Sequence, residues 1–249
     1  MSEAKLQRPR FKPGEVIISP VTEADLVSLA EGYHAAFPAT WFDKTEPPHL
    51  RLPDTVRARN FAARMVPWLR SPHTKWSKVT LASDPSRVIG HAGWLAPERT
   101  RGETVNFWRR DAGELLGWSE MMGWAEGVEE KLWSGVDVEE WQGNFLKWDR
   151  IRGERMAGEG HWLLAPLWVV PEYQGCGISS LLLKEIIEIA DNHEPSPPMY
   201  LEAMPTARPI YERFGWRGVE GEGSEFVMIR RGPWEGVNRE KKEGNGAEL

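Results

Sequence analysis

One short segment of the sequence combines residue types and spacing that suit phosphate binding. An apolar run ends at Val170, and two glycines, Gly175 and Gly177, then lead into an amphipathic pattern that starts at Ile178. A turn of this kind between a strand and a helix directs several backbone N–H groups and the positive end of a helix toward one point. Glycine lets an anion approach because no Cβ stands in the way. The segment therefore predicts a loop that binds a phosphate or pyrophosphate.

The loop differs from two well-known nucleotide-binding motifs. It lacks the Gly-Lys-Ser/Thr ending of a Walker loop, and it does not follow the G-x-G-x-x-G pattern of dinucleotide-binding proteins.

The segment instead resembles motif A of the GCN5-related N-acetyltransferases (GNAT), whose pattern is Gln/Arg-x-x-Gly-x-Gly/Ala. Here it reads Gln174-Gly175-Cys176-Gly177-Ile178-Ser179, with Ser in the last small position. Downstream, Tyr200-Leu201-Glu202-Ala203 and the run ARPIYERFGW at 207–216 resemble the later strand and the Tyr-x-x-x-Gly-Phe helix end of the family. The resemblance covers residues 161–229 well, and residues 15–97 only through the order of elements. A long insert at 99–160 is similar to that of fungal members.

The resemblance implies the GNAT-like acyl-CoA N-acyltransferase fold, of the α/β (α+β) class. We expect a mixed, twisted sheet of six to seven strands flanked by helices. One domain should cover 16–231, after a flexible arm at 1–15 and before a disordered tail at 232–249 that has almost nothing to bury. Apolar runs and periodicity predict strands near 16–18, 76–82, 87–95, 161–170, 199–203 and 225–229, a turn at 83–86, and helices near 22–33, 54–69, 178–189 and 207–214.

Acetyl-CoA is the acyl donor that the resemblance implies. In the family, backbone groups of the strand before the loop pair with pantetheine like an added strand, and the loop amides hold the pyrophosphate. By residue match, the first set is Leu167, Trp168 and Val169, and the second is Gln174, Gly175, Cys176, Gly177, Ile178 and Ser179. The family uses only the amide at the position of Cys176, so we expect no catalytic role for its thiol.

Direct transfer of an acyl group to an amine requires a base for the ammonium, an N–H for the oxyanion and an acid for the leaving thiolate. By residue match, Tyr211 is the acid and the Val169 N–H is a candidate oxyanion donor. Relatives place a Glu or His base at positions that match Leu163 and Ala165, and neither residue can take a proton.

The identity of the base therefore stays open among three candidates. Glu202 matches the Glu that serves as base in ribosomal-protein acetyltransferases, although it is closer in sequence to Tyr211 here. His161 shares a strand face with the usual base positions by the two-residue period of a strand. A chain of water molecules is the third candidate.

The insert at 99–160 holds six of the fourteen tryptophans. Stripes at 118–132 and 141–151 predict two amphipathic helices. These helices could cover the sheet, form a protein-interaction surface, or line an acceptor pocket with Trp141 and Trp148. Nine Lys/Arg against thirteen Asp/Glu in this stretch give −4, which favours a cationic amine over nucleic acid.

Composition narrows the function class further. The net charge of −6 gives no broad basic surface for nucleic acid, one cysteine excludes a disulfide framework, and no apolar run could cross a membrane. The scattered histidines predict no metal site. We expect a cytoplasmic enzyme that acetylates a small, aromatic or apolar amine. The alternatives are a GNAT scaffold with other chemistry on a hydrophobic metabolite and a non-catalytic CoA-binding protein.

Overall fold

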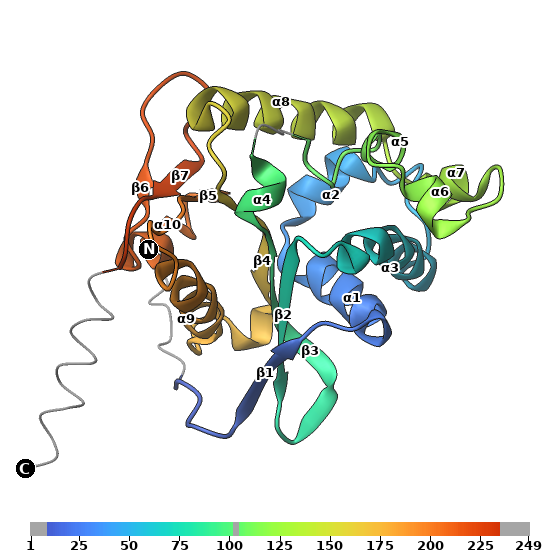
Figure 1. The fold of residues 1–249 in the computed structure, drawn as a ribbon. Coiled ribbons are helices and arrows are strands. Elements are labelled where there is room, and N and C mark those ends of the chain that lie inside the picture. Colours follow the sequence, from blue (N-terminus) through green and yellow to red (C-terminus); the bar gives the residue numbers. More distant parts are fainter. Residues whose placement is uncertain (1–8, 102–104, 235–249) are drawn as a thin grey trace, which may run out of the picture.

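The sheet contains seven strands and has the mixed character that the sequence predicts. The computed structural model describes residues 9–101 and 105–234. Over these residues the strand order is β1-β2-β3-β4-β5-β7-β6 (Figure 1). Neighbouring strands are antiparallel except for the parallel pair β4–β5. The strands are β1 Val16–Pro20, β2 Thr74–Leu81, β3 Asp84–Leu95, β4 Trp162–Val169, β5 Met199–Glu202, β6 Arg217–Gly218 and β7 Val227–Arg230.

Helices flank both faces of this sheet. In Figure 1, α9 lies on one side of strands β2–β4, and α1 and α3 lie on the other. None of the helices in the described part of the chain is long and apolar enough to span a membrane. The helices are α1 Leu26–Ala36, α2 Ala39–Thr45, α3 Asp54–Arg70, α4 Pro97–Thr100, α5 Ala112–Leu115, α6 Trp118–Met122, α7 Val128–Trp133, α8 Val138–Met156, α9 Ile178–Asp191 and α10 Arg208–Arg213, with short 3-10 turns η1 Glu23–Asp25 and η2 Pro171–Tyr173.

The predicted hairpin forms between β2 and β3, but its turn is shorter than expected. Asp84 already belongs to β3, so Ala82 and Ser83 make the turn. The Asp84 carboxylate accepts hydrogen bonds from the backbone N–H of Ser86 at 3.2 Å and from its hydroxyl at 2.6 Å. Asp and Ser favour turns because they form local bonds of this kind, so the segment has the composition of a turn although it belongs to a strand.

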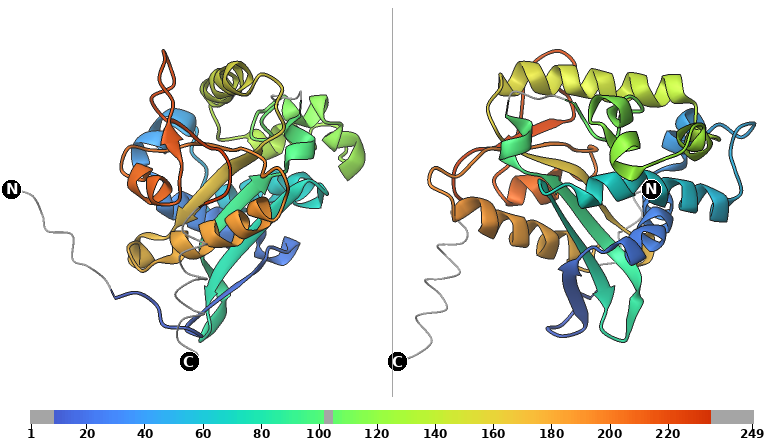
Figure 2. Two further views of the ribbon diagram at one scale, coloured as in Figure 1. Left: turned by 60° about the vertical axis from the view of Figure 1, so that its left-hand side comes forward. Right: turned by 45° about the vertical axis from the view of Figure 1, so that its right-hand side comes forward.

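The insert forms one of the two predicted helices. The second stripe is the 19-residue helix α8, which crosses the top of the molecule in Figure 1 and the right-hand view of Figure 2. The first stripe, at 118–132, is not a single helix, because it is divided into α6 and α7, and the short α5 precedes it. Gly123 caps the end of α6 and Gly127 precedes the start of α7, with φ values of 64° and 76° in the left-handed region. The sequence prediction followed the apolar spacing and missed this break.

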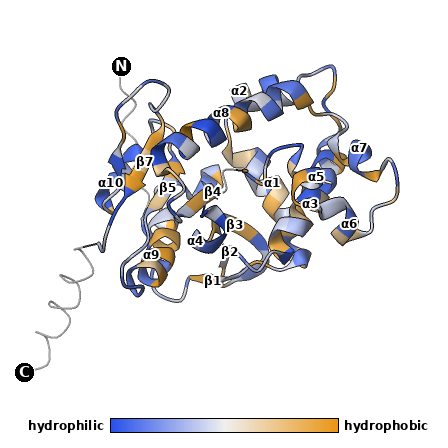
Figure 3. Cartoon of the chain, turned by 45° about the horizontal axis from the view of Figure 1, so that its top comes forward, coloured by the Kyte–Doolittle hydropathy of each residue, from blue (hydrophilic) through white to orange (hydrophobic). Residues whose placement is uncertain are grey.

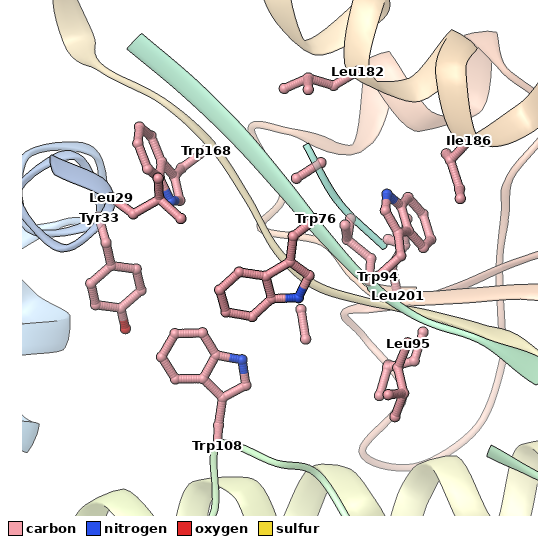
Figure 4. Close-up of a cluster of buried hydrophobic side chains, with 14 of the residues drawn as sticks. Leu29, Tyr33, Trp76, Trp94, Leu95, Trp108, Trp168, Leu182, Ile186 and Leu201 are labelled. Atoms are coloured by element: carbon pink, nitrogen blue, oxygen red, sulfur yellow. The ribbon is translucent and has the colours of Figure 1, made fainter. Parts of the chain in front are cut away.

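Apolar burial on both faces of the sheet fixes the positions of the helices. Helix α9 carries both orange and blue residues in Figure 3, as expected for an amphipathic helix. Figure 4 shows Leu182 and Ile186 of α9 approaching Trp94 from one side of the sheet, while Trp108 lies among aromatic rings on the other. The Trp108 ring centroid lies 5.6 Å from that of Tyr33 and 4.4 Å from that of Trp68. Several tryptophans that made the composition unusual therefore form core.

Candidate active site

Strands β4 and β5 separate soon after they pair. The parallel register joins Trp162 to Met199 and Leu163 to Tyr200, and β4 then continues to Val169 beside β3 alone. Between the β3 pairs of Leu164 and Leu167, β4 contains one more residue than β3 does, which bends the strand. The β5-facing edge of residues 164–169 is therefore without a neighbouring strand in the described part of the chain. We call this the open edge of β4.

Backbone groups of Val169 point toward the open edge. The Val170 N–H donates to the Ile89 carbonyl at 3.1 Å, so Val170 faces β3. In an antiparallel ladder the adjacent residue directs its N–H and C=O the opposite way. The Val169 carbonyl indeed accepts a hydrogen bond from Gln174 Nε2 at 3.0 Å. By the same alternation Leu167 also faces the open edge, so both residues can pair with an extended ligand.

Trp168 anchors this part of β4 to α1. Its ring is buried, and a Cβ added at Gly32 would lie 2.1 Å from the ring atom Cη2. The absence of a side chain at Gly32 therefore lets the helix approach the strand. Of the three predicted pantetheine-contacting residues, Trp168 supplies the rigid packing, while Leu167 and Val169 present the backbone groups.

The glycine loop leaves open space in front of the α9 N-terminus. Gly175 and Gly177 have φ values of 85° and 95°, which favour glycine. A Cβ at Gly175 would meet no described atom within 4 Å, and one at Gly177 would meet only the Arg10 side chain, at 3.8 Å. The first N–H groups of α9, including those of Ile178 and Ser179, have no intrahelical partners. Cys176, in the middle of the loop, is buried, and its carbonyl accepts a hydrogen bond from the Phe11 N–H at 3.4 Å. Gln174–Ser179 thus has the geometry of an anion-binding loop.

Glu202 and Tyr211 lie on the two elements that follow the loop and α9. Glu202 is the last residue of β5, and burial raises the pKa of its carboxyl to about 7, against the opposing influence of Arg152 and of the Tyr200 hydroxyl. Tyr211 lies on α10 and is 5 % exposed. Burial raises the pKa of its hydroxyl above the ordinary value of 10, so the group stays protonated at neutral pH. The pair offers a carboxyl poised to exchange a proton and a protonated phenol.

His161 lies at the closed end of the gap between β4 and β5. It precedes Trp162 and Leu163, the residues that still pair with β5. Its Nδ1 lies 2.7 Å from the Glu159 carbonyl, and its backbone N–H donates to Thr100 Oγ1 at 2.8 Å. Burial lowers the pKa of the imidazole to about 4. The structure therefore places His161 away from the open edge, in an environment that disfavours its protonation.

A buried ionic network under α8 was missed by the sequence analysis. Asp149 accepts hydrogen bonds from Arg152 Nη2 at 3.2 Å, from Arg109 Nη1 at 3.1 Å and from the Asn106 N–H at 2.8 Å. Burial raises the pKa of Asp149, and Arg152 lies close enough to lower that of Glu202. The signal was present in the sequence, since Asp149 and Arg152 lie four residues after Phe145 and Trp148 on the apolar stripe of α8.

The two tryptophans predicted to line an acceptor pocket have different environments. Trp141 is 1 % exposed, its Nε1 donates to the Trp108 carbonyl at 2.6 Å, and its ring contacts other aromatic rings. It is a core residue and has no open face for a ligand, contrary to the expectation. Trp148 is half-buried, and its ring lies 5.7 Å from that of Phe226, edge to face.

Family comparison agrees with the open edge and the glycine loop. Residues 150–230, which include β4, the loop, Glu202 and Tyr211, match the model of the acetyltransferase (GNAT) domain. This part of the chain is similar to a GNAT acetyltransferase domain, and the match supports an acyl-CoA-dependent acyltransferase that uses acetyl-CoA as donor. No curated protein sequence matches the chain.

Solved structures with a similar fold are distant in sequence. One is described as histone acetyltransferase HPA2 and related acetyltransferase, from Corynebacterium glutamicum. It is 17% identical to this chain, the match covers 88% of this chain and 97% of that chain, and the TM-score is 0.48. A GNAT family acetyltransferase from Brucella melitensis in complex with acetyl-CoA has 13% identity, covers 88% of each chain and has a TM-score of 0.44. The GNAT family N-acetyltransferase YhbS from Escherichia coli in complex with CoA has 13% identity, 93% and 89% coverage and a TM-score of 0.45.

Proposed function

We propose that the protein transfers an acetyl group from acetyl-CoA directly to the amine of a small molecule, in a ternary complex. The observation that carries this proposal is the open edge of β4, flanked by the glycine loop at one end and by Glu202 across the gap. In the proposal, Leu167 and Val169 pair with pantetheine, and the amides of Gln174–Ser179 bind the pyrophosphate.

The proton transfers divide between Glu202 and Tyr211. Ionised Glu202 takes a proton from the acceptor ammonium, directly or through water, and the free amine attacks the thioester carbon. The Val169 N–H stabilises the oxyanion. When the C–N bond has formed and the C–S bond breaks, Tyr211 donates its proton to the thiolate. We assign the base to Glu202 rather than to His161, because a carboxyl with a pKa of about 7 is far better matched to neutral pH than an imidazole with a pKa of about 4.

For the acceptor we propose a small cationic amine with an aromatic or apolar part. The half-buried Trp148 and Phe226 rings could contact such a group, and the acidic insert attracts a cation, although salt screens this effect. Trp141 is left out of this proposal because of its burial. The kinship with fungal members that carry a long insert, and a cytoplasmic location, are part of the same proposal.

Calorimetric titration with acetyl-CoA tests the donor site. We expect binding at micromolar concentrations, much tighter than that of adenosine diphosphate, and desulfo-CoA should also bind. Gly175→Ala should weaken acetyl-CoA binding, because the added Cβ enters the space in front of the loop. Gly232→Ala is a matched control, since Gly232 has a similar φ of 75° and no described atom within 4 Å of an added Cβ.

A screen of amines then tests the reaction by release of free thiol from acetyl-CoA. Turnover with an aromatic or apolar amine would support the proposal. If millimolar acetyl-CoA does not bind, the proposed donor site is wrong. If acetyl-CoA binds but no amine is acetylated, the non-catalytic CoA-binding alternative replaces the enzyme.

A further inference from the structure

A second group of buried charges lies among α2, α3 and α7, outside the candidate active site. Glu46 and Arg64 are 2 % and 6 % exposed. Arg57 is also largely buried, and its Nε donates a hydrogen bond to Glu46 Oε2. We call Glu46, Arg57 and Arg64 the arginine cluster.

Several N–H donors of the arginine cluster are unused. Within the described residues, Nε and Nη1 of Arg64 and Nη2 of Arg57 have no hydrogen-bond partner. The Arg64 guanidinium carbon lies 4.1 Å from the centroid of the Trp133 ring. Stacking of this kind engages the flat face of the guanidinium and leaves the N–H groups at its edge without acceptors. Buried donors without acceptors are costly, so each requires an explanation.

The buried charges of the cluster do not balance. Two guanidinium groups face one carboxylate, and burial lowers the pKa of the nearby His34, which keeps this imidazole neutral at neutral pH. Asp54 lies 3.9 Å from Arg57 Nη1, but its side chain is 95% exposed and therefore well screened by water. Arg110, which also influences Arg64, is paired with Glu129 at 2.5 Å. One positive charge remains in excess among the buried groups.

The cluster borders a cavity of about 10 Å³, which also contacts Asn60, Ser134 and Gly135. A space of this size holds one water-sized particle. A water molecule could accept hydrogen bonds from the arginines but could not compensate their charge. Chloride is only somewhat larger than water, whereas a sulfate or a diphosphate is much larger than this space. We propose that this cavity is a binding site for a single small monovalent anion, with chloride as its ligand. The bound ion would link α3 to the segments that follow α2 and α7.

Thermal unfolding of the whole chain tests this proposal, with sodium chloride replaced by sodium gluconate at constant ionic strength. Gluconate is too large for the cavity. When chloride exceeds its Kd about tenfold, Tm should be about 3 to 6 °C higher than in gluconate, and it should keep rising with the logarithm of the chloride concentration. Equal Tm values in the two salts would overturn the proposal.

Variants separate this site from general effects of salt. Arg64→Met should lose the chloride-dependent rise in Tm, whereas Arg150→Met, at an arginine 69% exposed on α8, should keep it. If Arg64→Met does not fold, Arg64→Lys preserves the charge with fewer N–H donors and should weaken the chloride response. Crystals soaked in bromide provide an independent readout. An anomalous peak beside Arg64 supports the site, and a cavity without one refutes it.

Discussion

In the proposed mechanism, burial is the main effect that prepares Glu202 and Tyr211 for opposite proton transfers. Burial disfavours the charged form of each group, so it raises the pKa of both. For a carboxyl the result is a value of about 7, where the group can accept and release a proton near neutral pH. For a phenol it is a hydroxyl that remains a donor. In the proposed mechanism, the same physical effect therefore provides both the base and the acid.

Replacing Glu202 by Gln should remove the pH dependence that this carboxyl imposes. In the wild type, kcat should rise with pH through an apparent pKa of about 7, because only ionised Glu202 accepts the ammonium proton. Glu202→Gln should lose this rise and reduce kcat by about 10² to 10⁴-fold. The measurement is a pH profile of kcat at saturating amine, with Glu212→Gln, at an exposed glutamate of α10, as control. A variant that retains the wild-type profile would exclude Glu202 as the base.

Removing the Tyr211 hydroxyl should affect turnover and leave donor binding intact. Tyr211→Phe keeps the ring that packs 6.0 Å from Trp216, so the fold is preserved while the proton donor is lost. We expect kcat to fall by up to about 10² to 10⁴-fold, with the Kd for acetyl-CoA unchanged. Tyr33→Phe is the control, since Tyr33 is also 5 % exposed and lies on α1. Equal kcat values for Tyr211→Phe and the wild type would remove this hydroxyl from the mechanism.

At the scale of elements, replacing a glycine by alanine should have opposite effects on stability in two helices: a gain at Gly143 of α8 and a loss at Gly32 of α1. In a helix, Gly→Ala stabilises by up to about 1 kcal/mol through propensity. At Gly143 of α8 an added Cβ meets no described atom within 4 Å, so this gain should appear. At Gly32 of α1 the Cβ would lie 2.1 Å from the buried Trp168 ring, and the overlap should cost about 1 to 3 kcal/mol.

Urea unfolding of the two alanine variants measures both effects on the free energy of unfolding. Gly32→Ala should also weaken acetyl-CoA binding, because Trp168 anchors the part of β4 that carries the open edge. Destabilisation by Gly143→Ala, or neutrality of Gly32→Ala, would contradict this account of how α1 and α8 are packed.

The elements also show which features can be read from sequence. The hydrophobic period of 178–189 predicts α9, because its buried residues recur on one face, and the two glycines predict the loop before it. The division of the predicted helix at 118–132 into α6 and α7 depends on the left-handed Gly123 and Gly127, and apolar spacing contains no information about φ. The ionic network of Asp149 and Arg152 was missed for a different reason: both residues lie on the apolar stripe of α8, but charged residues on a helix usually face water. The structure buries both residues, where Arg109 and Asn106 of the preceding segment bond to Asp149.

Across the whole molecule, stability should fall in mild acid because two histidines are buried in neutral form. Burial lowers the pKa of His91 and of His161 to about 4, from an ordinary value of 6.5. The folded state therefore binds fewer protons than the unfolded state in this range. The stabilisation is complete above pH 6.5 and is lost as the pH falls toward 4. Each histidine contributes a slope of up to about 1.4 kcal/mol per pH unit.

Glu202 acts in the opposite direction, since its raised pKa favours the protonated carboxyl in the folded state as the pH falls from about 7 toward 4.5. Among these three groups, two histidines against one carboxyl leave a net loss of about 1.4 kcal/mol per pH unit in the window they share. The lowered pKa of His34 adds to this loss, and the raised pKa of Asp149 opposes it. Urea unfolding of the wild type and of His91→Gln between pH 7 and pH 5 checks this balance. The variant should lose stability less steeply by up to about 1.4 kcal/mol per pH unit, whereas His49→Gln, at an exposed histidine, should follow the wild type. Parallel slopes for His91→Gln and the wild type would mean that His91 titrates alike in the folded and unfolded chains, and the acid sensitivity would then have to arise from other groups.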